Sequence, residues 1–282
     1  MNQKLADYKK IQVHGGKFHM DDVMCVILAM RANPEIEVVR GGEPMVNDDD
    51  TIVADYGNTE FDHHDQGKIR TYEDGIKMSA CGLMMEKFGE ELFPDEYVRR
   101  NVLKNVIKGI DAIDNGQTGM IDNIGVSMTD IVRVFNGTWD SRCKDGMKLF
   151  YEAVSVTKVI FEKEIERIQS NERAENIITD AYEKAEDKHI IVFEQYVPAK
   201  EYFAENTEDV KFIIFPSNRG GYTLATVPPD MDHIMEQRCS IAMSGKDAIE
   251  GVTFIHQNLF IAATETVESA VALAKYSILE ND

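Results

Sequence analysis

Long apolar runs are absent from this sequence. None of its 282 residues belongs to a stretch of about 18 consecutive apolar residues, the length that a membrane-spanning helix needs. The first ten residues, MNQKLADYKK, also lack the apolar segment of a secretory signal. We therefore expect a cytoplasmic protein that does not interact with membranes.

Paired cysteines are absent as well. The four cysteines (Cys25, Cys81, Cys143 and Cys239) stand singly and form no C-x-x-C motif. This spacing argues against a zinc knuckle and against a disulfide framework. Cys25 and Cys81 lie among apolar neighbours, which predicts that both are buried thiols.

Basic residues are too few to balance the acidic ones. The chain has 30 Lys and Arg against 50 Asp and Glu, which gives a formal net charge of −20. A protein that grips long duplex nucleic acid normally presents a broad basic face, so this class is disfavoured unless basic residues gather locally. An acidic surface can simply maintain solubility, but it also attracts metal cations.

Strands and helices alternate in the first part of the chain. Apolar runs at 10–15, 35–42 and 51–57 predict strands, and residues 21–31 predict a helix that ends near the Asn-Pro pair at 33–34. This order predicts an α/β fold with a mostly parallel sheet flanked by helices. Polar residues follow the strand ends, where ligands bind in such folds.

The rest of the chain predicts a long helical segment and a second α/β region. Helices are expected at 78–89, 96–116, 144–186 and 267–278, and strands at 189–193, 211–216, 221–227, 250–256 and 259–264. We expect a catalytic domain at 1–140, a helical connector at 141–187 and a smaller α/β domain at 188–282. The long helix is compatible with a homodimer or with packing inside one chain.

Two short stretches concentrate metal-binding side chains. VHGGKFHMDD (13–22) and FDHHD (61–65) hold four of the seven histidines, together with several aspartates. Imidazole and carboxylate groups together suit Mn²⁺, Fe²⁺, Co²⁺ or Zn²⁺. The residues at predicted strand ends or helix starts are His14, His19, Asp21, Asp55, Asp62, His63 and His64. The set exceeds the needs of one ion, so we expect a two-metal site bridged by Asp55.

Each of these residues also has a simpler interpretation. Asp21 or Asp22 alone would serve as a helix cap or first-turn acid, and a single histidine beside a strand is usually just hydrogen-bonded. The metal site is favoured because all of the groups fall at positions that converge in a parallel sheet.

The sequence also resembles that of a known protein family. Asp62-His63-His64 after the N-terminal cluster resembles the DHH phosphoesterase superfamily, and more closely its Myg-type (melanocyte-proliferating-gene, UPF0160-like) branch. The branch pattern H-x-G-x-F-H-x-D-[ED] is matched by His14, Gly16, Phe18, His19, Asp21 and Asp22. The resemblance continues through MSACGLMMEKFG, DAIDNG, RVFNGTWDS and the C-terminal part. One departure is FIAAT (260–264), where the family usually has the glycine-rich FIGG.

The resemblance implies two divalent metal ions, most simply Mn²⁺, with Mg²⁺ or Co²⁺ as alternatives. It implies one ion held by His14, His19 and Asp55, and a second held by Asp21, Asp55, His63 and Asp114. Asp111 lies on the same helix face and remains an alternative to Asp114, or supports the ligands from behind. Asp62 is expected to orient His63, and His64 to face the phosphate.

The C-terminal region is expected to bind the rest of the substrate. In SNRGGYTL (217–224), Arg219 would bind a phosphate, Gly220 and Gly221 would allow close backbone approach, and Tyr222 would stack on a base. The alternative is a β-hairpin with the two glycines in its turn. His256 is a weaker candidate that is equally well explained as a core histidine.

The resemblance implies that the protein is a metal-dependent phosphodiesterase. The resemblance implies a 3′–5′ exonuclease on short single-stranded RNA or oligonucleotides, acting through water activated by two metal ions. One alternative is a small-molecule phosphohydrolase that acts on a dinucleotide, a nucleoside bisphosphate or pyrophosphate. Another is a non-catalytic RNA-binding protein that the metal ions stabilise.

Overall fold

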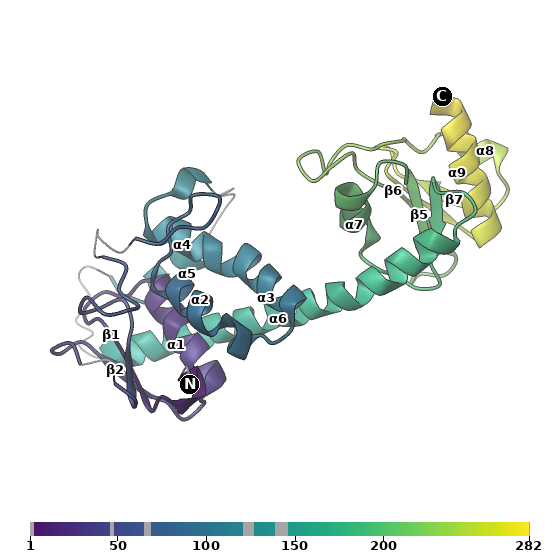
Figure 1. The fold of residues 1–282 in the computed structure, drawn as a ribbon. Coiled ribbons are helices and arrows are strands. Elements are labelled where there is room, and N and C mark those ends of the chain that lie inside the picture. Colours follow the sequence, from purple (N-terminus) through teal and green to yellow (C-terminus); the bar gives the residue numbers. More distant parts are fainter. Residues whose placement is uncertain (1–2, 46–47, 65–68, 121–126, 139–145, 282) are drawn as a thin grey trace. The chain divides into compact units, whose positions relative to one another are not determined.

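The computed structural model describes residues 3–45, 48–64, 69–120, 127–138 and 146–281. The chain forms two compact units, unit 1 at 1–169 and unit 2 at 170–282. The boundary falls inside the helix α6 (Gly146–Lys184), which contributes residues to both units (Figure 1). The connector predicted for 141–187 is thus shared between the units, and its status as a separate segment stays a prediction.

Unit 1 is built on a small parallel sheet. Its strands β1 (Lys10–Val13), β2 (Glu37–Arg40) and β3 (Thr51–Val53) lie in the order β2-β1-β3, and both pairings are parallel. The helix α1 (Met20–Ala32) forms the crossover between β1 and β2. The predicted α/β class and parallel sheet are therefore confirmed, and the carboxyl ends of β1 and β3 lie side by side.

The helix α1 contacts β1, and further helices pack with it in unit 1. They are α2 (Ala80–Leu92), α3 (Glu96–Val102), α4 (Lys108–Asp114), α5 (Met128–Val134) and the first part of α6, with short 3₁₀ turns at Leu5–Asp7 and Thr118–Met120. The single helix predicted at 96–116 is interrupted by a π-helical turn at Leu103–Ile107. A π turn changes the helical phase and often occurs near functional sites. Here it precedes α4, which ends at Asp114.

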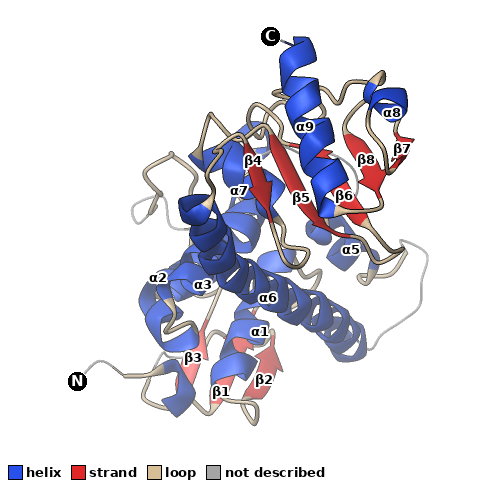
Figure 2. Ribbon diagram, turned by 90° about the vertical axis from the view of Figure 1, so that its right-hand side faces the viewer, coloured by secondary structure: helices blue, strands red, loops and turns tan. Residues whose placement is uncertain are grey.

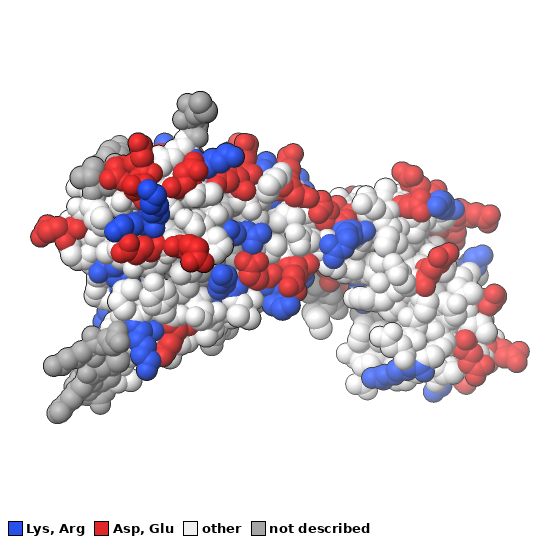
Figure 3. Space-filling model, turned by 90° about the horizontal axis from the view of Figure 1, so that it is seen from below, with Lys and Arg blue, Asp and Glu red and all other residues white. Residues whose placement is uncertain are grey.

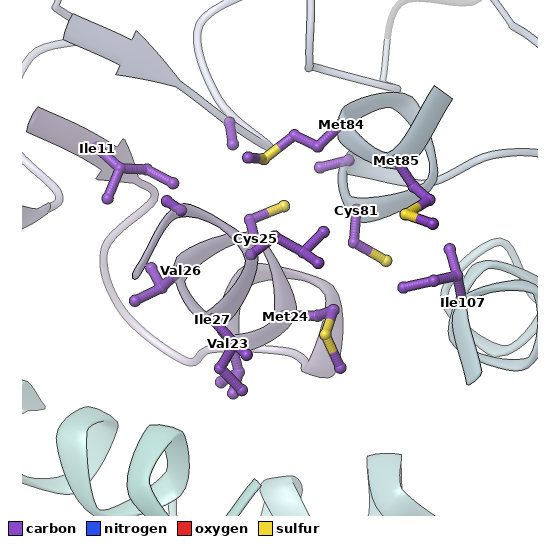
Figure 4. Close-up of a cluster of buried hydrophobic side chains, with 14 of the residues drawn as sticks. Ile11, Val23, Met24, Cys25, Val26, Ile27, Cys81, Met84, Met85 and Ile107 are labelled. Atoms are coloured by element: carbon purple, nitrogen blue, oxygen red, sulfur yellow. The ribbon is translucent and has the colours of Figure 1, made fainter. Parts of the chain in front are cut away.

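The core of unit 1 lies between α1 and α2. Cys25, Cys81 and Met84 project into this layer, whereas Ile27 points from the other side of α1 beside Val23, and all of these side chains are fully buried (Figure 4). Burial raises the pKa of both thiols. Cys239 is also buried, whereas Cys143 lies outside the described residues.

Unit 2 contains a five-stranded mixed sheet in the order β4-β5-β6-β8-β7. The strands are β4 (Ile190–Val192), β5 (Phe212–Pro216), β6 (Tyr222–Thr226), β7 (Val252–Ile255) and β8 (Ile261–Thr264). On one face of the sheet, the core includes residues of α7 (Ala199–Asn206) and of the C-terminal part of α6. On the other face, it includes residues of α9 (Val267–Asn281). The remaining helix, α8 (Gly245–Ala248), is short. Figure 2 shows α9 lying across the strands.

The Gly-Gly pair forms the tight turn of the β5–β6 hairpin. Ser217 N–H donates to Gly221 O over 2.9 Å, and Gly221 has a φ of +67°. A Cβ atom at Gly221 would lie 2.1 Å from Thr264 O, so glycine is required by the neighbouring strand β8. The hairpin alternative is therefore the local structure of this segment. Across the described residues, every helix is too short or too polar to span a membrane.

Candidate metal centre

Several segments bring imidazole and carboxylate groups to one edge of the unit 1 sheet. His14 follows β1, and Asp55 follows β3. His19 is the N-cap of α1, whose first turn holds Asp21 and Asp22. The remaining members are His63 and His64 in the loop after Phe61, and Asp114 at the end of α4. Because strands β1 and β3 are parallel neighbours, chain segments distant in sequence meet here.

Asp55 adopts an unusual backbone conformation. Its φ is +55°, in the left-handed region that aspartate tolerates better than most residues. Its N–H donates to Phe61 O over 2.9 Å, next to a parallel bridge between Ala54 and Phe61. These contacts bring the segment that carries His63 back against the end of β3. A left-handed backbone conformation at a residue other than glycine occurs more often at functional sites than elsewhere.

The side chains approach each other closely. His63 Nε2 lies 3.0 Å from Asp55 Oδ1, 3.1 Å from Asp114 Oδ2 and 3.9 Å from Asp21 Oδ2. His14 Nε2 lies 2.9 Å from Asp22 Oδ2 and 3.4 Å from Asp55 Oδ2. His19 Nδ1 is more distant, at 3.9 Å from Asp114 Oδ1.

Several buried atoms of this cluster make no hydrogen bond of normal geometry within the described part of the chain, although two of them, His63 Nε2 and Asp55 Oδ1, form an ion pair at 3.0 Å. They are Asp21 Oδ1 and Oδ2, Asp22 Oδ1, Asp55 Oδ1 and His63 Nε2. The side chains of Asp21 and Asp22 have no exposed surface. A buried carboxylate without a partner is costly unless it is paired or coordinates a cation. The donor set and its unpartnered atoms therefore fit divalent metal ions.

The pKa values reflect this crowding. Burial, and then the charges of Asp55, Asp22 and Asp114, raise the pKa of Asp21 well above its usual range. Burial also raises the pKa of Asp55, which the nearby His63 opposes. Although burial lowers it, the carboxylates of Asp114 and Asp55 raise the pKa of His63 to about 10. Contact with Asp22 is the main cause that raises the pKa of His14 to about 9.

Three groups of side chains within the described ranges could each hold a metal ion. They are His14, His19, Asp22 and Asp55; then Asp55, His63 and His64; then His19, Asp21 and Asp114. Within each group, the ligand atoms lie within 4.8 Å of one another. Asp55 belongs to two groups, as expected of a bridging ligand.

Asp22 is the residue that the sequence interpretation left out of the ligand set. It does cap α1, because its Oδ2 accepts the His19 N–H over 2.9 Å. The same oxygen contacts His14, and the residue belongs to a candidate metal group. The acidic pair Asp21-Asp22 inside the matched pattern was the signal that could have indicated this second role.

Asp62 lies against a different histidine from the one expected. Its Oδ1 is 2.8 Å from His64 Nδ1 and 3.1 Å from His64 N, so it orients His64 instead of His63. Its Oδ2 accepts the Asn58 N–H. These hydrogen bonds lower the pKa of Asp62, although burial opposes them. The His64 side chain is 64% exposed and reaches within 3.5 Å of Asp55 Oδ1.

Asp111 lies apart from the three groups. Its Oδ1 accepts hydrogen bonds from Ser79 Oγ (2.6 Å) and Ser79 N (3.0 Å), and its Oδ2 accepts one from Tyr72 Oη (2.7 Å). A Cβ atom on Gly82 would lie 2.2 Å from Asp111 Oδ2, so the fit there is tight. Asp111 thus joins the segment at 72–82 to α4, and Asp114 is the aspartate of this helix that faces His63.

The C-terminal candidates all belong to unit 2. Arg219 is exposed, and Gly220 and Gly221 form the hairpin turn beside it. The His256 ring is half-buried in the β7–β8 turn, 4.6 Å from the Phe260 ring centroid. A role for these residues in substrate binding stays a prediction.

Fold and site together define a two-unit α/β protein with clusters of histidine and aspartate that could bind metal ions. The chain belongs to the uncharacterised protein family UPF0160, whose family model matches residues 10–278. The family resemblance predicted from the sequence is confirmed. Placement in the DHH phosphoesterase superfamily stays a prediction.

Similar proteins occur across eukaryotes. A Saccharomyces cerevisiae protein named MYG1 protein is 25% identical over 99% of this chain and 97% of its own length. A Schizosaccharomyces pombe protein, also named MYG1 protein, is 23% identical over 95% and 97%. A Homo sapiens protein named MYG1 exonuclease is 22% identical over 98% and 88%. No solved structure matches the chain.

Proposed function

We propose that this protein is a divalent-metal-dependent phosphodiesterase, and specifically a 3′–5′ exonuclease on RNA or short oligonucleotides. The observation that carries the proposal is the set of buried, unpartnered carboxylate oxygens that converge with imidazoles at one sheet edge. The relatives named MYG1 exonuclease support the nuclease activity. A cytoplasmic location and a homodimer stay predictions.

The proposed metal ligands come from four segments of unit 1. His14, His19, Asp22 and Asp55 would hold one ion, and Asp21, Asp55, His63 and Asp114 the other. When bound, a pair of ions, most simply Mn²⁺, supplies cations that neutralise the phosphate and activate water.

The DHH segment would contribute a proton donor beside the ions. Asp62 holds Nδ1 of His64, so the outer edge of this exposed ring is free to face substrate. A histidine at this position can donate a hydrogen bond to a phosphoryl oxygen as charge develops there. On the face in view in Figure 3, acidic side chains are interspersed with basic ones, and such a face fits short substrates better than long duplexes.

An assay with three substrates in parallel tests this function. Purified protein with Mn²⁺ would receive a 5′-labelled RNA oligonucleotide, dinucleotides and pyrophosphate. A ladder of shortening labelled RNA is expected, because a 3′–5′ exonuclease leaves the labelled end until last. Cleavage confined to dinucleotides and pyrophosphate would replace the proposal with a small-molecule phosphohydrolase. Metal binding without any turnover would indicate the non-catalytic alternative.

Metal binding is expected to release protons. In the metal-free protein, pKa values of about 10 for His63 and about 9 for His14 leave both imidazoles protonated at neutral pH. A metal ion must displace these protons, so Mn²⁺ affinity should rise with pH until about 9 to 10. In the metal-free protein, these raised histidine pKa values also stabilise the folded state. The contribution is fully present below the ordinary histidine pKa of 6.5 and is lost as the pH rises to about 9 for His14 and about 10 for His63.

Isothermal titration of Mn²⁺ in two buffers of different ionisation enthalpy measures this release. The apparent binding enthalpy should differ between the buffers at neutral pH, and the difference should shrink as the pH is raised toward 9. Equal enthalpies at neutral pH would show that the imidazoles are already deprotonated, or that they do not bind the metal.

A further inference from the structure

A cavity of about 410 Å³ adjoins the candidate metal centre. It is lined by Lys17, Phe18, His19, Ile113, Asp114, Thr129, Arg133, Asn136 and Gly137. His19 and Asp114 are proposed metal ligands, so one wall of the cavity is the metal centre itself. The volume falls within the range of about 300–1,000 Å³ that is typical of small-molecule sites.

Two cations line this cavity together with the metal ligands His19 and Asp114. Lys17 is exposed on the loop between β1 and α1, and Arg133 lies in the last turn of α5. Asp130 Oδ1 is 3.7 Å from Arg133 Nη1, which is a loose contact, while Asp130 Oδ2 is held by Ser127 Oγ at 2.7 Å. In a chain of net charge −20, two cations at one cavity beside carboxylate-rich metal ligands favour an anionic occupant.

The segment that carries Arg133 is fixed to the loop that carries Lys17 and the metal ligand His19. Asn136 Oδ1 accepts the Phe18 N–H over 2.9 Å, and Asn136 Nδ2 donates to Phe18 O over 2.8 Å. The side chain amide thus pairs with both backbone groups of the residue before His19. α5 also packs against α1, which His19 begins. The distance from the cations to the metal ligands is therefore set by the fold.

We propose that this cavity binds one nucleotide unit next to the scissile phosphate, and that Arg133 and Lys17 bind a second phosphate group on that unit. The inference rests on the proposed phosphodiesterase function. Guanidinium and ammonium groups both recognise phosphate oxygens, and a guanidinium does so with two parallel hydrogen bonds. Ile113, which is partly exposed at this cavity, supplies apolar surface for the sugar or base between the two phosphates.

Dinucleotides with and without an end phosphate test the proposal. Wild-type protein with Mn²⁺ is expected to cleave a dinucleotide bearing a 5′- or a 3′-terminal phosphate more efficiently than the unphosphorylated dinucleotide. In Arg133→Gln, the ratio of kcat/KM between the phosphorylated and unphosphorylated substrates should fall about tenfold, because the guanidinium that binds the end phosphate is removed. This factor corresponds to about 1.4 kcal/mol. The terminus that gives the preference identifies the side of the scissile bond on which the cavity acts.

A matched control removes a charge elsewhere in unit 1. Lys163 lies on α6, pairs with Glu166 and does not line the cavity. Lys163→Gln should leave the substrate ratio unchanged, and Lys17→Gln should lower it. Because the cations are exposed, added salt should also reduce the preference.

Binding measurements keep the inference separate from the catalytic proposal. Fluorescence anisotropy with labelled dinucleotides and Ca²⁺ measures Kd without turnover. The ratio of the Kd values of the unphosphorylated and phosphorylated dinucleotides then gives the substrate preference. If wild type binds the phosphorylated dinucleotide more tightly and Arg133→Gln loses this preference, the cavity assignment holds even when nothing is cleaved. A ratio that Arg133→Gln leaves unaltered in both measurements overturns the assignment, whether or not the protein is a phosphodiesterase.

Discussion

Asp55→Asn is expected to lower Mn²⁺-dependent phosphodiester cleavage by a factor of about 10³ or more. Asp55 belongs to two candidate metal groups, so this change weakens both proposed sites. Metal ions contribute several kcal/mol to such reactions, and 1.36 kcal/mol corresponds to a factor of ten in rate. The measurement is kcat/KM on labelled RNA or on a dinucleotide at saturating Mn²⁺.

The amide variant is preferred because it preserves the backbone. The φ of +55° at position 55 is accessible to asparagine, whereas alanine would add strain. Asparagine removes one of the charges that raise the pKa of Asp21 but also one that raises the pKa values of His63 and His14, so these opposite effects should leave the metal-free variant folded. Circular dichroism and thermal unfolding in the presence of chelator check both expectations.

Asp50→Asn is the matched control. This aspartate precedes β3, is exposed and pairs with Lys9 at 2.7 Å. The control should retain wild-type turnover. Full activity in a folded Asp55→Asn variant would mean that the end of β3 does not hold the metal ions, and the proposed ligand assignment would then be wrong.

Removing metal should markedly destabilise unit 1. A ligand present at one hundred times its Kd stabilises the native state by about 2.7 kcal/mol per site. For domains of this size, each kcal/mol shifts Tm by about 2–4 °C. With two sites, Mn²⁺-saturated protein should unfold about 10 °C or more above chelator-treated protein.

Hydrogen exchange locates the effect within the chain. Mn²⁺ should slow amide exchange at the start of α1 and in residues 54–63, which carry the proposed ligands. The β7–β8 hairpin of unit 2 serves as an internal control and should exchange at the same rate. The Asp55→Asn variant should lose most of the protection. Uniform protection of both units, or none, would indicate that metal binds elsewhere or not at all.

The meeting of His14 and Asp55 was predictable from the sequence, because apolar runs ending in polar residues follow a general rule of parallel sheets. The choice between Asp111 and Asp114 was not, since the two residues lie one turn apart on one helix. Ser79 and Tyr72, which come from a distant segment, donate hydrogen bonds to the carboxylate of Asp111. Asp114 is therefore the aspartate that faces His63.

Other features of the site depend on local turn geometry and on helix packing, and the sequence did not predict them. Asp62 turns toward His64 because the backbone N–H groups of His64 and Asn58 both donate to its carboxylate. The dual role of Asp22 was hidden for a similar reason, because a first-turn acid is already explained by capping. The cavity beside Arg133 depends on packing between α5 and α1, which no periodicity in the sequence reports.

The shared helix α6 has a consequence for how the molecule folds. Phe161, Ile165 and Ile168 belong to the core of unit 1, whereas Ala174 and Ile178 belong to a core of unit 2. Starting a helix is unfavourable, but lengthening one adds a hydrogen bond for each residue that is ordered. Whichever core condenses first therefore supplies the other with a preformed template. A chain cut between Gln169 and Ser170 would lose this advantage on both sides and leave each fragment with a frayed end.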